Sequence, residues 1–405
     1  MSRSIALREV EGRSQGYWLL LGGLALLSGL ALLAAYYMES NGHHVTGMTN
    51  QIVWGLPHVF AVFLIVAASG ALNVASIASV FGRAVYQPLA PLSGLLAIAL
   101  LAGGLAVLVL DLGRPDRLFV AMSTFNFKSI FAWNIFLYTG FFAVVGVYLW
   151  LMMERRLNRY ASGAGLFAFL WRLVLTTGTG SIFGFLVARQ AYDAAIMAPL
   201  FIAMSFSFGM ALFILVLAAA GSSTGRPLGN FLIRRLGKLL GLFVAAVLYF
   251  AAVQHLTNLY ASEHHGVERF ILIEGGIHTW LFWGGQVLVG GLLPLALLHL
   301  PATHGSRKGI LAASALAILG GFAQVYVIII GGQAYPLVLF PGMEASSVFF
   351  DGAVNPYAPS LAEFALGLGG MAISLLIVAL AVKFLRFLPE TLADAALDPH
   401  FKAPP

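Results

Sequence analysis

Long apolar segments separated by short polar connections are the main feature of this chain. Ten of these segments reach the length of roughly 20 residues that a helix needs to cross a bilayer. They lie near residues 18–38, 55–81, 91–112, 129–153, 166–188, 196–220, 236–261, 278–300, 310–331 and 361–385. The pattern predicts an all-α integral membrane protein with about ten transmembrane helices. The first segment is too long for a signal peptide and no small-residue cleavage site follows it, so we expect a retained helix.

The composition agrees with a membrane protein and limits its chemistry. Hydrophobic residues make up 60% of the 405 residues and charged residues only 9%, which is too apolar for a water-soluble core of ordinary proportions. The chain has no cysteine, which excludes disulfides, thiolate-ligated iron–sulfur clusters and thiolate-ligated haem within it. Any such centre would sit on a partner. The net charge of +6 lies mainly in loops between helices, so we expect a lipid bilayer and no nucleic acid as a partner.

The distribution of Lys and Arg predicts the orientation in the membrane. Counted by alternate sides, sixteen lie on the side of the N-terminus and five on the other side, with Arg172 inside a helix. The positive-inside rule therefore predicts that both termini are cytoplasmic, in a bacterial inner membrane. Three of the five exceptions, Arg114, Arg117 and Lys128, follow the third helix. These three cations lie on the side where the positive-inside rule predicts few, so we expect that a role other than setting the topology retains them there.

A weak internal repeat predicts the domain organisation. The second and sixth segments contain "GLPHVF" and "MAPLFI", and the fourth and eighth contain "FAWNIF" and "TWLFWGG", at an offset of about 142–150 residues. Because this offset spans four helices, the repeat predicts two related four-helix bundles, at 51–190 and 191–335. Residues 1–50 would form a cytoplasmic N-terminus and a first flanking helix. Residues 336–405 would form an outer loop, the last helix and a cytoplasmic tail. The connection 332–360 is rich in Gly, Pro and aromatic residues, which favours a docking surface.

The stretch "VLVLDLGRPDRLF" at 107–119 places four charges at one membrane boundary. Asp111 ends the third helix and Arg114 follows it, so we expect the two to pair, since an unpaired ion at such a place costs several kcal/mol. Asn126 and Lys128 lie near the same boundary. A purely structural pair that staples the loop is the alternative interpretation.

Three histidines, His58, His255 and His278, are expected near one depth toward the outer face. A quinone head group needs such a setting, with donors for two carbonyls, a group that passes protons at physiological pH and apolar walls for the tail. A b-type haem held by His58 and His255 is a competing use of the same residues, because it needs two imidazoles on facing helices at matched depth.

Polar residues expected within the membrane are candidates for a proton path. We single out Asn73, Arg172, Asp193, Gln286 and Glu363. Ordinary structural roles are the alternative, since Arg172 could extend to the cytoplasmic boundary and amides often join helices by hydrogen bonds. The sequence has no phosphate-binding loop, paired-histidine metal motif or nucleophile elbow, so we expect no metal site and no active site of a soluble-enzyme type.

The strings "DLGRPDRLF" and "FNFKSIFAWN" resemble the membrane subunits of the NrfD/polysulfide-reductase family. The start of the second helix, "VWGLPHVFAVFLIVAASGALN", is similar to that family's Trp-Gly-x-Pro element. The stretch "GGQAYPLVLFPG" is similar to the ten-helix members of the family. The resemblance covers roughly 50–385, and its most specific part is DLGRP. Asn126 to Lys128 departs from the Asn-Pro-type turn of many members.

The resemblance implies a haem-free, quinone-binding membrane subunit of an oxidoreductase complex. Such a subunit exchanges electrons between quinone, either ubiquinone or menaquinone, and a ferredoxin-like iron–sulfur subunit, which connects to a catalytic subunit that commonly holds molybdopterin. By position, His58, Asp111 and Arg114 would shape the quinone pocket, with His255 as a second candidate. Arg117, Asn126 and Lys128 would face the iron–sulfur partner. A secondary transporter and a b-haem-binding anchor are the alternative functions.

Overall fold

The computed structural model describes residues 5–337 and 353–401, and these form an almost entirely helical protein. Ten helical spans are long and apolar enough to cross a membrane, which confirms the predicted all-α membrane fold. The spans are α1 (Gln15–Asn41); α2 (Leu56–Ala71) with α3 (Asn73–Ser79); η2 (Ala84–Leu89) with α4 (Ala90–Leu110); α6 (Ile130–Met153); η4 (Asn158–Tyr160) with α7 (Ala161–Gly184); α8 (Met197–Thr224); α9 (Asn230–Tyr260); α11 (Ile277–Trp280) with η7 (Leu281–Leu292) and α12 (Leu293–His299); α13 (Arg307–Tyr326) with η8 (Val327–Gly331) and α14 (Gly332–Ala334); and α15 (Leu361–Phe384).

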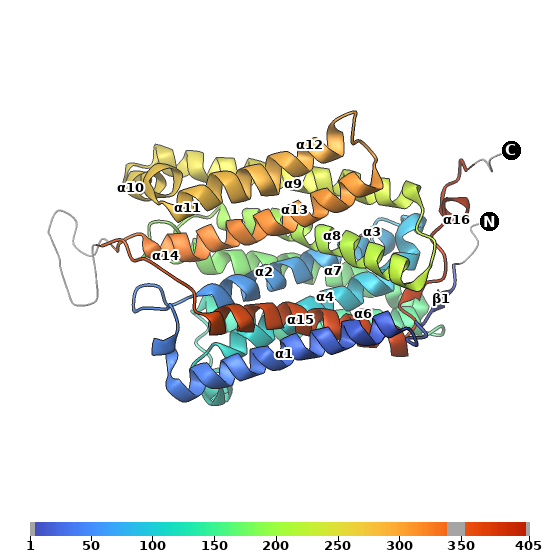
Figure 1. Ribbon diagram of the computed structural model, residues 1–405, viewed down its shortest axis with the longest axis horizontal. Coiled ribbons are helices and arrows are strands. Elements are labelled where there is room, and N and C mark those ends of the chain that lie inside the picture. Colours follow the sequence, from blue (N-terminus) through green and yellow to red (C-terminus); the bar gives the residue numbers. More distant parts are fainter. Residues whose placement is uncertain (1–4, 338–352, 402–405) are drawn as a thin grey trace.

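Short elements connect the spans at their ends. They are β1 (Leu7–Arg8), η1 (His43–Val45), η3 (Pro115–Arg117), α5 (Leu118–Ser123), η5 (Ser262–His264), α10 (His265–Arg269), η6 (Phe270–Glu274), β2 (Leu388–Pro389) and α16 (Asp394–Leu397). The spans run side by side along the long axis, and β1 and α16, the first and last described elements, lie at the same end of the molecule (Figure 1). We call this the terminal end, and we call the opposite end, where α10 and α14 lie, the distal end.

The central spans pack in two groups, and each group consists of spans that follow one another in the sequence. The first group contains α2, α4, α6 and α7, and the second contains α8, α9, α13 and the span from α11 to α12. Helices α1 and α15 pack on each other, and α15 also packs on α4 and α2. Because α2 also packs extensively on α8, the two groups share one continuous interior. The predicted domain boundaries therefore stay predictions.

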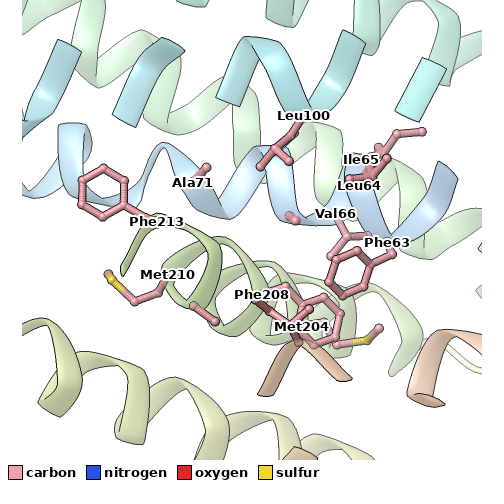
Figure 2. Packing of buried hydrophobic residues seen from close by; sticks show 14 of the residues in the cluster. Phe63, Leu64, Ile65, Val66, Ala71, Leu100, Met204, Phe208, Met210 and Phe213 are labelled. Atoms are coloured by element: carbon pink, nitrogen blue, oxygen red, sulfur yellow. The ribbon is translucent and has the colours of Figure 1, made fainter. Parts of the chain in front are cut away.

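The contact between α2 and α8 forms the centre of the core. Figure 2 shows Phe63 of α2 beside Phe208 of α8, with Leu100 of α4 on the other side of α2. The ring of Phe63 stacks on Phe208 at 5.0 Å and on Phe322 at 3.9 Å between centroids. Further along the crossing, a Cβ on Gly209 would collide with the backbone of Gly70. The small residues thus let the two backbones approach closely, as membrane helices require for tight packing.

The helix formed by α2 and α3 is interrupted at Leu72, where a serine of α4 completes its hydrogen bonding. Ser93 Oγ donates to the carbonyl of Ala71 at 2.6 Å and accepts from the amide of Ala75 at 3.0 Å. Interruptions in membrane helices persist only where neighbouring helices satisfy the freed backbone groups. Ser93 is fully buried and supplies both bonds.

The terminal end is closed by a two-stranded sheet between the first and last described segments. β1 and β2 pair antiparallel, with Leu7 opposite Pro389. The guanidinium of Arg226 donates to four carbonyls around this sheet, those of Arg8, Glu9, Leu388 and Pro389. This arrangement ties the segment before the first span to the segment after the last.

Candidate functional site

A histidine and a carboxylate meet at the distal end, where α2 begins and α4 ends. Gly55 precedes α2 and Pro57 occupies its first turn, which is favourable because the amides there have no partner within the helix. This start places His58 at the distal boundary. Asp111 is the residue at which α4 stops. His58 Nδ1 lies 2.9 Å from Asp111 Oδ2, and the Asp111 side chain is fully buried.

The Asp111 carboxylate is unusual in its lack of other partners. The contact with His58 is short, but its angles fall outside the range of a hydrogen bond, and neither oxygen of Asp111 accepts a hydrogen bond from the described residues. A buried carboxylate needs a charged or hydrogen-bonded partner, and His58 is the residue placed to provide it.

An aromatic wall lies beside this pair. The ring of Trp54 stacks on His58 with centroids 6.1 Å apart. It also contacts Phe131 of α6, Phe183 of α7 and Tyr192 at 5.9 to 6.5 Å. The wall therefore draws on the segment before α2, on α6, on α7 and on the connection between α7 and α8. Flat apolar surfaces next to a titratable ring suit an aromatic ligand.

A hydrogen-bond network fixes the segment that carries Trp54. Gln333 Oε1 accepts from the amides of Val53 and Trp54, each at 3.0 Å, and its Nε2 donates to the Trp54 carbonyl. Arg189 donates to the carbonyls of Gln51 and Gln333 at 2.6 and 3.0 Å. Burial lowers the pKa of Arg189 from its ordinary value, although the group stays cationic at any physiological pH. The second helix group thus holds the aromatic wall of the first.

The expected pair between Asp111 and Arg114 is wrong. Arg114 instead pairs with Asp116 through two hydrogen bonds of 3.1 and 3.2 Å, and the two side chains are 66% and 62% exposed. The chain turns back at Gly113, whose φ of +69° favours glycine, and this turn carries Arg114 out toward solvent. The hydrogen bond from Arg114 lowers the pKa of Asp116.

The residues predicted to dock a partner share an exposed position in the same distal connection. Arg117, Asn126 and Lys128 are all exposed. Asn126 Oδ1 accepts from the backbone amide of Lys128 at 3.1 Å, which forms a local turn. The position is compatible with docking, which stays a prediction. Of the other predicted docking segment, 332–360, residues 338–352 lie outside the described part of the chain.

His255 belongs to a second histidine–carboxylate group. Its Nδ1 lies 2.7 Å from Oε2 of Glu268 on α10, and Asn258 donates to the other oxygen of Glu268 at 2.8 Å. Glu268 is buried, and the ring of Phe282 stands edge-on to His255 at 4.6 Å. None of these residues contacts the aromatic wall around His58, so the structure does not bring the two histidines together.

This separation bears on the haem alternative. Helix α8 packs against both α2 and α9, which carry His58 and His255, and lies between them in Figure 1. The facing helices that a haem held by these two histidines would need are therefore not found. His278, the third of the predicted histidines, is buried next to Phe270 and Tyr326, and its Nδ1 has no hydrogen-bond partner among the described residues.

Arg172 lies deep in the protein and does not extend to the boundary. The predicted helix 166–188 begins earlier in the structure, at Ala161, so Arg172 is about three turns from its start. The side chain is 1% exposed, donates to the Ser69 carbonyl at 3.2 Å and lies 4.9 Å from the rings of Phe169 and Phe206. Asn73, at the start of α3, is also buried, and its Nδ2 has no described partner.

The remaining candidates for a proton path lie in different places. Asp193 is exposed in the connection between α7 and α8, outside the membrane spans, because α7 ends at Gly184. Gln286 is buried in the second group, where it lines with Gln324 a cavity of about 10 Å³, close to the size needed by one water. Glu363 accepts from Tyr357 Oη and from the amides of Gly47 and Ser360, and so caps α15 at the distal end.

Three residues that shape these sites do not stand out in the sequence. Trp54 belongs to the Trp-Gly-x-Pro element before the second helix, and the pattern of hydrophobic and polar residues alone does not mark it as part of a site. Glu268 lies in a short polar connection and Gln333 at the end of an apolar segment, so neither was predicted. No group of three or more His, Asp or Glu residues within 5–337 and 353–401 is arranged to hold a metal ion.

Comparison with known proteins identifies the family. A family model described as Polysulphide reductase, NrfD matches residues 44–336. The chain is 28% identical to the Hdr-like menaquinol oxidoreductase integral membrane subunit of Archaeoglobus fulgidus, over 98% of this chain and 100% of that protein. It is 29% identical to a putative dimethyl sulfoxide reductase membrane subunit of Halobacterium salinarum, over 93% and 92% of the two proteins. A polysulfide reductase chain of Wolinella succinogenes is 27% identical over 71% of this chain and 96% of its own length. Because the matched segment spans more than half of the chain, the protein belongs to the NrfD polysulphide reductase family of membrane subunits.

Proposed function

We propose that this protein is the quinone-reactive membrane subunit of a multi-subunit oxidoreductase, and that its reaction takes place beside His58 and Asp111. The names of its relatives support the class, since they include membrane subunits of menaquinol, dimethyl sulfoxide and polysulfide oxidoreductases. The observation that carries the proposal is the His58–Asp111 contact of 2.9 Å at the membrane boundary, next to the ring of Trp54.

The pair supplies the proton chemistry that a quinol requires. Oxidation of a quinol releases two electrons and two protons. His58 faces Asp111 through Nδ1, which leaves Nε2 to accept a proton from the substrate hydroxyl. The buried carboxylate of Asp111 stabilises the imidazolium that forms and takes up the proton in turn, so that His58 is ready for the second. Trp54 and Phe131 provide flat surfaces for the ring of the substrate. Quinone reduction would use the same steps in reverse.

The electrons leave through a partner in this proposal. The chain has no cysteine to hold an iron–sulfur cluster. By resemblance to the family, the acceptor in this proposal is a ferredoxin-like iron–sulfur subunit that docks at the distal end. That subunit connects in turn to a catalytic subunit that holds molybdopterin. The distal end would face away from the cytoplasm, because most Lys and Arg residues lie at the terminal end. Both termini would then be cytoplasmic, in a bacterial inner membrane.

A polar ladder in the first helix group is the best candidate for a proton path. It runs from Asn134, which donates to the carbonyl of Gly178, through the contact between Tyr138 and Thr179, to Thr176 and Ser69. Arg172, which donates to the Ser69 carbonyl, extends it toward the terminal end. Asn73 lies about one turn beyond Ser69, and its Nδ2 has no partner among the described residues. We propose that this ladder supports proton transfer, and Gln286 offers a second, separate site in the other group.

One observation favours the transporter alternative. A transporter is expected to carry polar residues on interrupted helices inside the membrane, and the interruption at Leu72 lies near Ser69, Asn73 and Arg172. Ser93 fills this interruption with two short hydrogen bonds, however, which leaves the freed backbone groups at Ala71 and Ala75 occupied. Substrate uptake into vesicles in the absence of a redox partner would support the transporter.

The proposed function is tested by separating the quinone reaction from the partner's own activity. His58→Gln and Asp111→Asn should lower quinone-dependent turnover per assembled complex by about 10²-fold or more, as expected for a lost acid–base group. Activity of the catalytic partner with a soluble dye should stay normal. His265→Gln and Asp116→Asn are matched controls, because both residues are exposed at the distal end. Normal quinone turnover in both site variants would show that the reaction takes place elsewhere.

A further inference from the structure

A groove near the terminal end combines an apolar floor with an exposed lysine. It lies between α9 and α12, has a volume of about 610 Å³, and is lined by Lys238, Gly241, Leu242, Ala245, Leu295, Ala296, His299 and Leu300. Lys238 is about two turns beyond the start of α9, and His299 is the last residue of α12. We propose that this groove binds one anionic phospholipid, whose phosphate lies between Lys238 and His299 and whose acyl chain follows the groove toward the membrane interior.

The groove exists because small residues face each other across the two helices. Lys238, Gly241, Leu242 and Ala245 share one face of α9, since residues three and four positions apart lie together on a helix. Gly241 and Ala245 leave room that larger side chains would fill. The ring of His299 lies directly over Gly241, where an added Cβ would approach its Cε1 to 2.6 Å. The floor of the groove is therefore set by a close contact between the helices.

The head of the groove carries a lysine whose charge no described residue compensates. Lys238 is exposed and forms no ion pair and no hydrogen bond with the described residues. His299 Nδ1 donates to the Leu295 carbonyl at 3.0 Å, and Nε2 has no partner among the described residues. In the protonated ring Nε2 carries a second N–H, which can donate to a phosphate oxygen. A basic pocket between transmembrane helices near the boundary is the setting in which phospholipid head groups bind.

The walls favour a lipid over a free phosphate. Leu242 is 63% exposed and Leu300 is 55% exposed, both within or next to membrane spans. An inorganic anion would use the cationic head and leave these apolar surfaces uncovered. An acyl chain covers them, and each buried CH₂ adds to the binding.

A second hollow at the terminal end contains arginines whose hydrogen bonds are already used within the protein. It measures about 830 Å³ and contains Arg226 and Arg307. Arg226 already donates to four carbonyls and Arg307 donates to the Leu228 carbonyl at 3.3 Å. These guanidinium groups serve the fold, whereas Lys238 has no such partner among the described residues. Of these two hollows, only the groove between α9 and α12 therefore offers an anionic ligand a cation without a described partner.

The test uses the assembled complex, stripped of lipid in detergent, with phosphatidylglycerol as the probe. Native mass spectrometry should detect one retained phosphatidylglycerol, and thermal unfolding should shift upward with this lipid and not with phosphatidylcholine. Lys238→Gln should weaken the apparent affinity roughly fivefold, as for the loss of one basic residue near a charged lipid. His299→Gln should weaken it as well. Arg155→Gln, which removes an exposed cation at the same end, should leave it unchanged.

Ala245→Leu examines the acyl part of the groove separately from its charge. The residue is exposed, so the larger side chain should be tolerated, and it should reduce retention of phosphatidylglycerol although Lys238 and His299 remain. Equal binding of phosphatidylcholine, equal stabilisation by inorganic phosphate alone, or equal losses in Arg155→Gln and Lys238→Gln would each overturn the proposal. Quinone turnover does not enter the measurement, so the outcome is independent of the proposed function.

Discussion

Nη1 of Arg172 donates to the backbone carbonyl of Ser69 over 3.2 Å, while Oγ of Ser69 donates back to the carbonyl of Arg172. This reciprocal pair joins α7 to the last turns of α2, just before the interruption at Leu72. The carbonyl end of a helix carries partial negative charge. The cation therefore lies at a favourable position although it forms no ion pair with the described residues.

For the stability of the protein, the shape of the Arg172 guanidinium should matter more than its charge. In Arg172→Lys the charge is retained as a compact, strongly hydrated ammonium that is less able to contact Ser69 and two aromatic rings together. We expect a loss of about 3–5 kcal/mol, the cost of an uncompensated buried charge. Arg172→Met removes the charge and keeps the length, so it should cost less than Lys. Thermal unfolding of the purified variants gives the order, and a Lys variant as stable as wild type would contradict it.

Ser93 should contribute strongly to stability because it satisfies two backbone groups at once. Ser93→Ala leaves the Ala71 carbonyl and the Ala75 amide without this partner, and we expect a loss of about 2–4 kcal/mol. Ser374→Ala is a matched control, since Ser374 is equally buried but bonds only to the Gly370 carbonyl of its own helix. Denaturant or thermal unfolding should show a much smaller loss for the control. Equal losses would mean that the interruption at Leu72 does not depend on Ser93.

Arg114 is expected to be nearly neutral for stability. Its partner is the exposed Asp116, and exposed ion pairs contribute little. Arg114→Gln should leave the thermal midpoint unchanged near neutral pH. The lowered pKa of Asp116 means that any contribution is present above the unfolded pKa and disappears as the pH falls through the folded value. A large loss of stability in Arg114→Gln would instead support the pair with Asp111 that the sequence predicted.

The crossing of α2 and α8 should tolerate no side chain at its centre. A Cβ on Gly209 meets the backbone of Gly70, which has no room to move, so Gly209→Ala should cost about 3 kcal/mol or more. Gly146→Ala in α6 is the control, because no atom lies within 4 Å of the added Cβ. The control should be neutral or slightly stabilising. The yield of assembled protein and its thermal midpoint distinguish the two.

Cross-linking can establish which end meets the partner. Lys128 is exposed at the distal end and Lys308 at the terminal end, so the two lysines report on opposite faces. An amine-reactive cross-linker should connect Lys128, and not Lys308, to the iron–sulfur subunit in the intact complex. Cross-links from Lys308 alone would place the electron acceptor on the opposite side.

The sequence predicted the spans well because their length and apolarity are set by the bilayer, independently of their neighbours. It placed His58 and Asp111 correctly at the same end, since each adjoins a helix boundary. It failed where a side chain had several possible partners. Arg114 follows Asp111 and precedes Asp116 in sequence, and only the turn at Gly113 decides between them.

Other failures came from contacts between distant segments. Glu268 is buried only because α10 folds back onto α9, which a short polar stretch does not reveal. Asp193 was assigned to the membrane although it lies between the predicted segments 166–188 and 196–220; in the structure α7 ends at Gly184 and Asp193 is exposed in the connection to α8. The interruption at Leu72 depends on Ser93 of another helix, and no proline marks it.

The strand pairing at the terminal end sets an order on the biosynthesis of the protein. Arg8 and Glu390, which form an ion pair beside this sheet, are 382 positions apart in sequence. At the usual rate of translation, roughly 20 to 80 s pass between the synthesis of the two residues. Throughout that time β1 has no partner strand, because β2 follows the last span and all the spans after α1 are synthesised first. The sheet and the contacts of Arg226 with the carbonyls of Leu388 and Pro389 can therefore form only after the last span has been synthesised. They join the two ends of the chain only in a complete bundle.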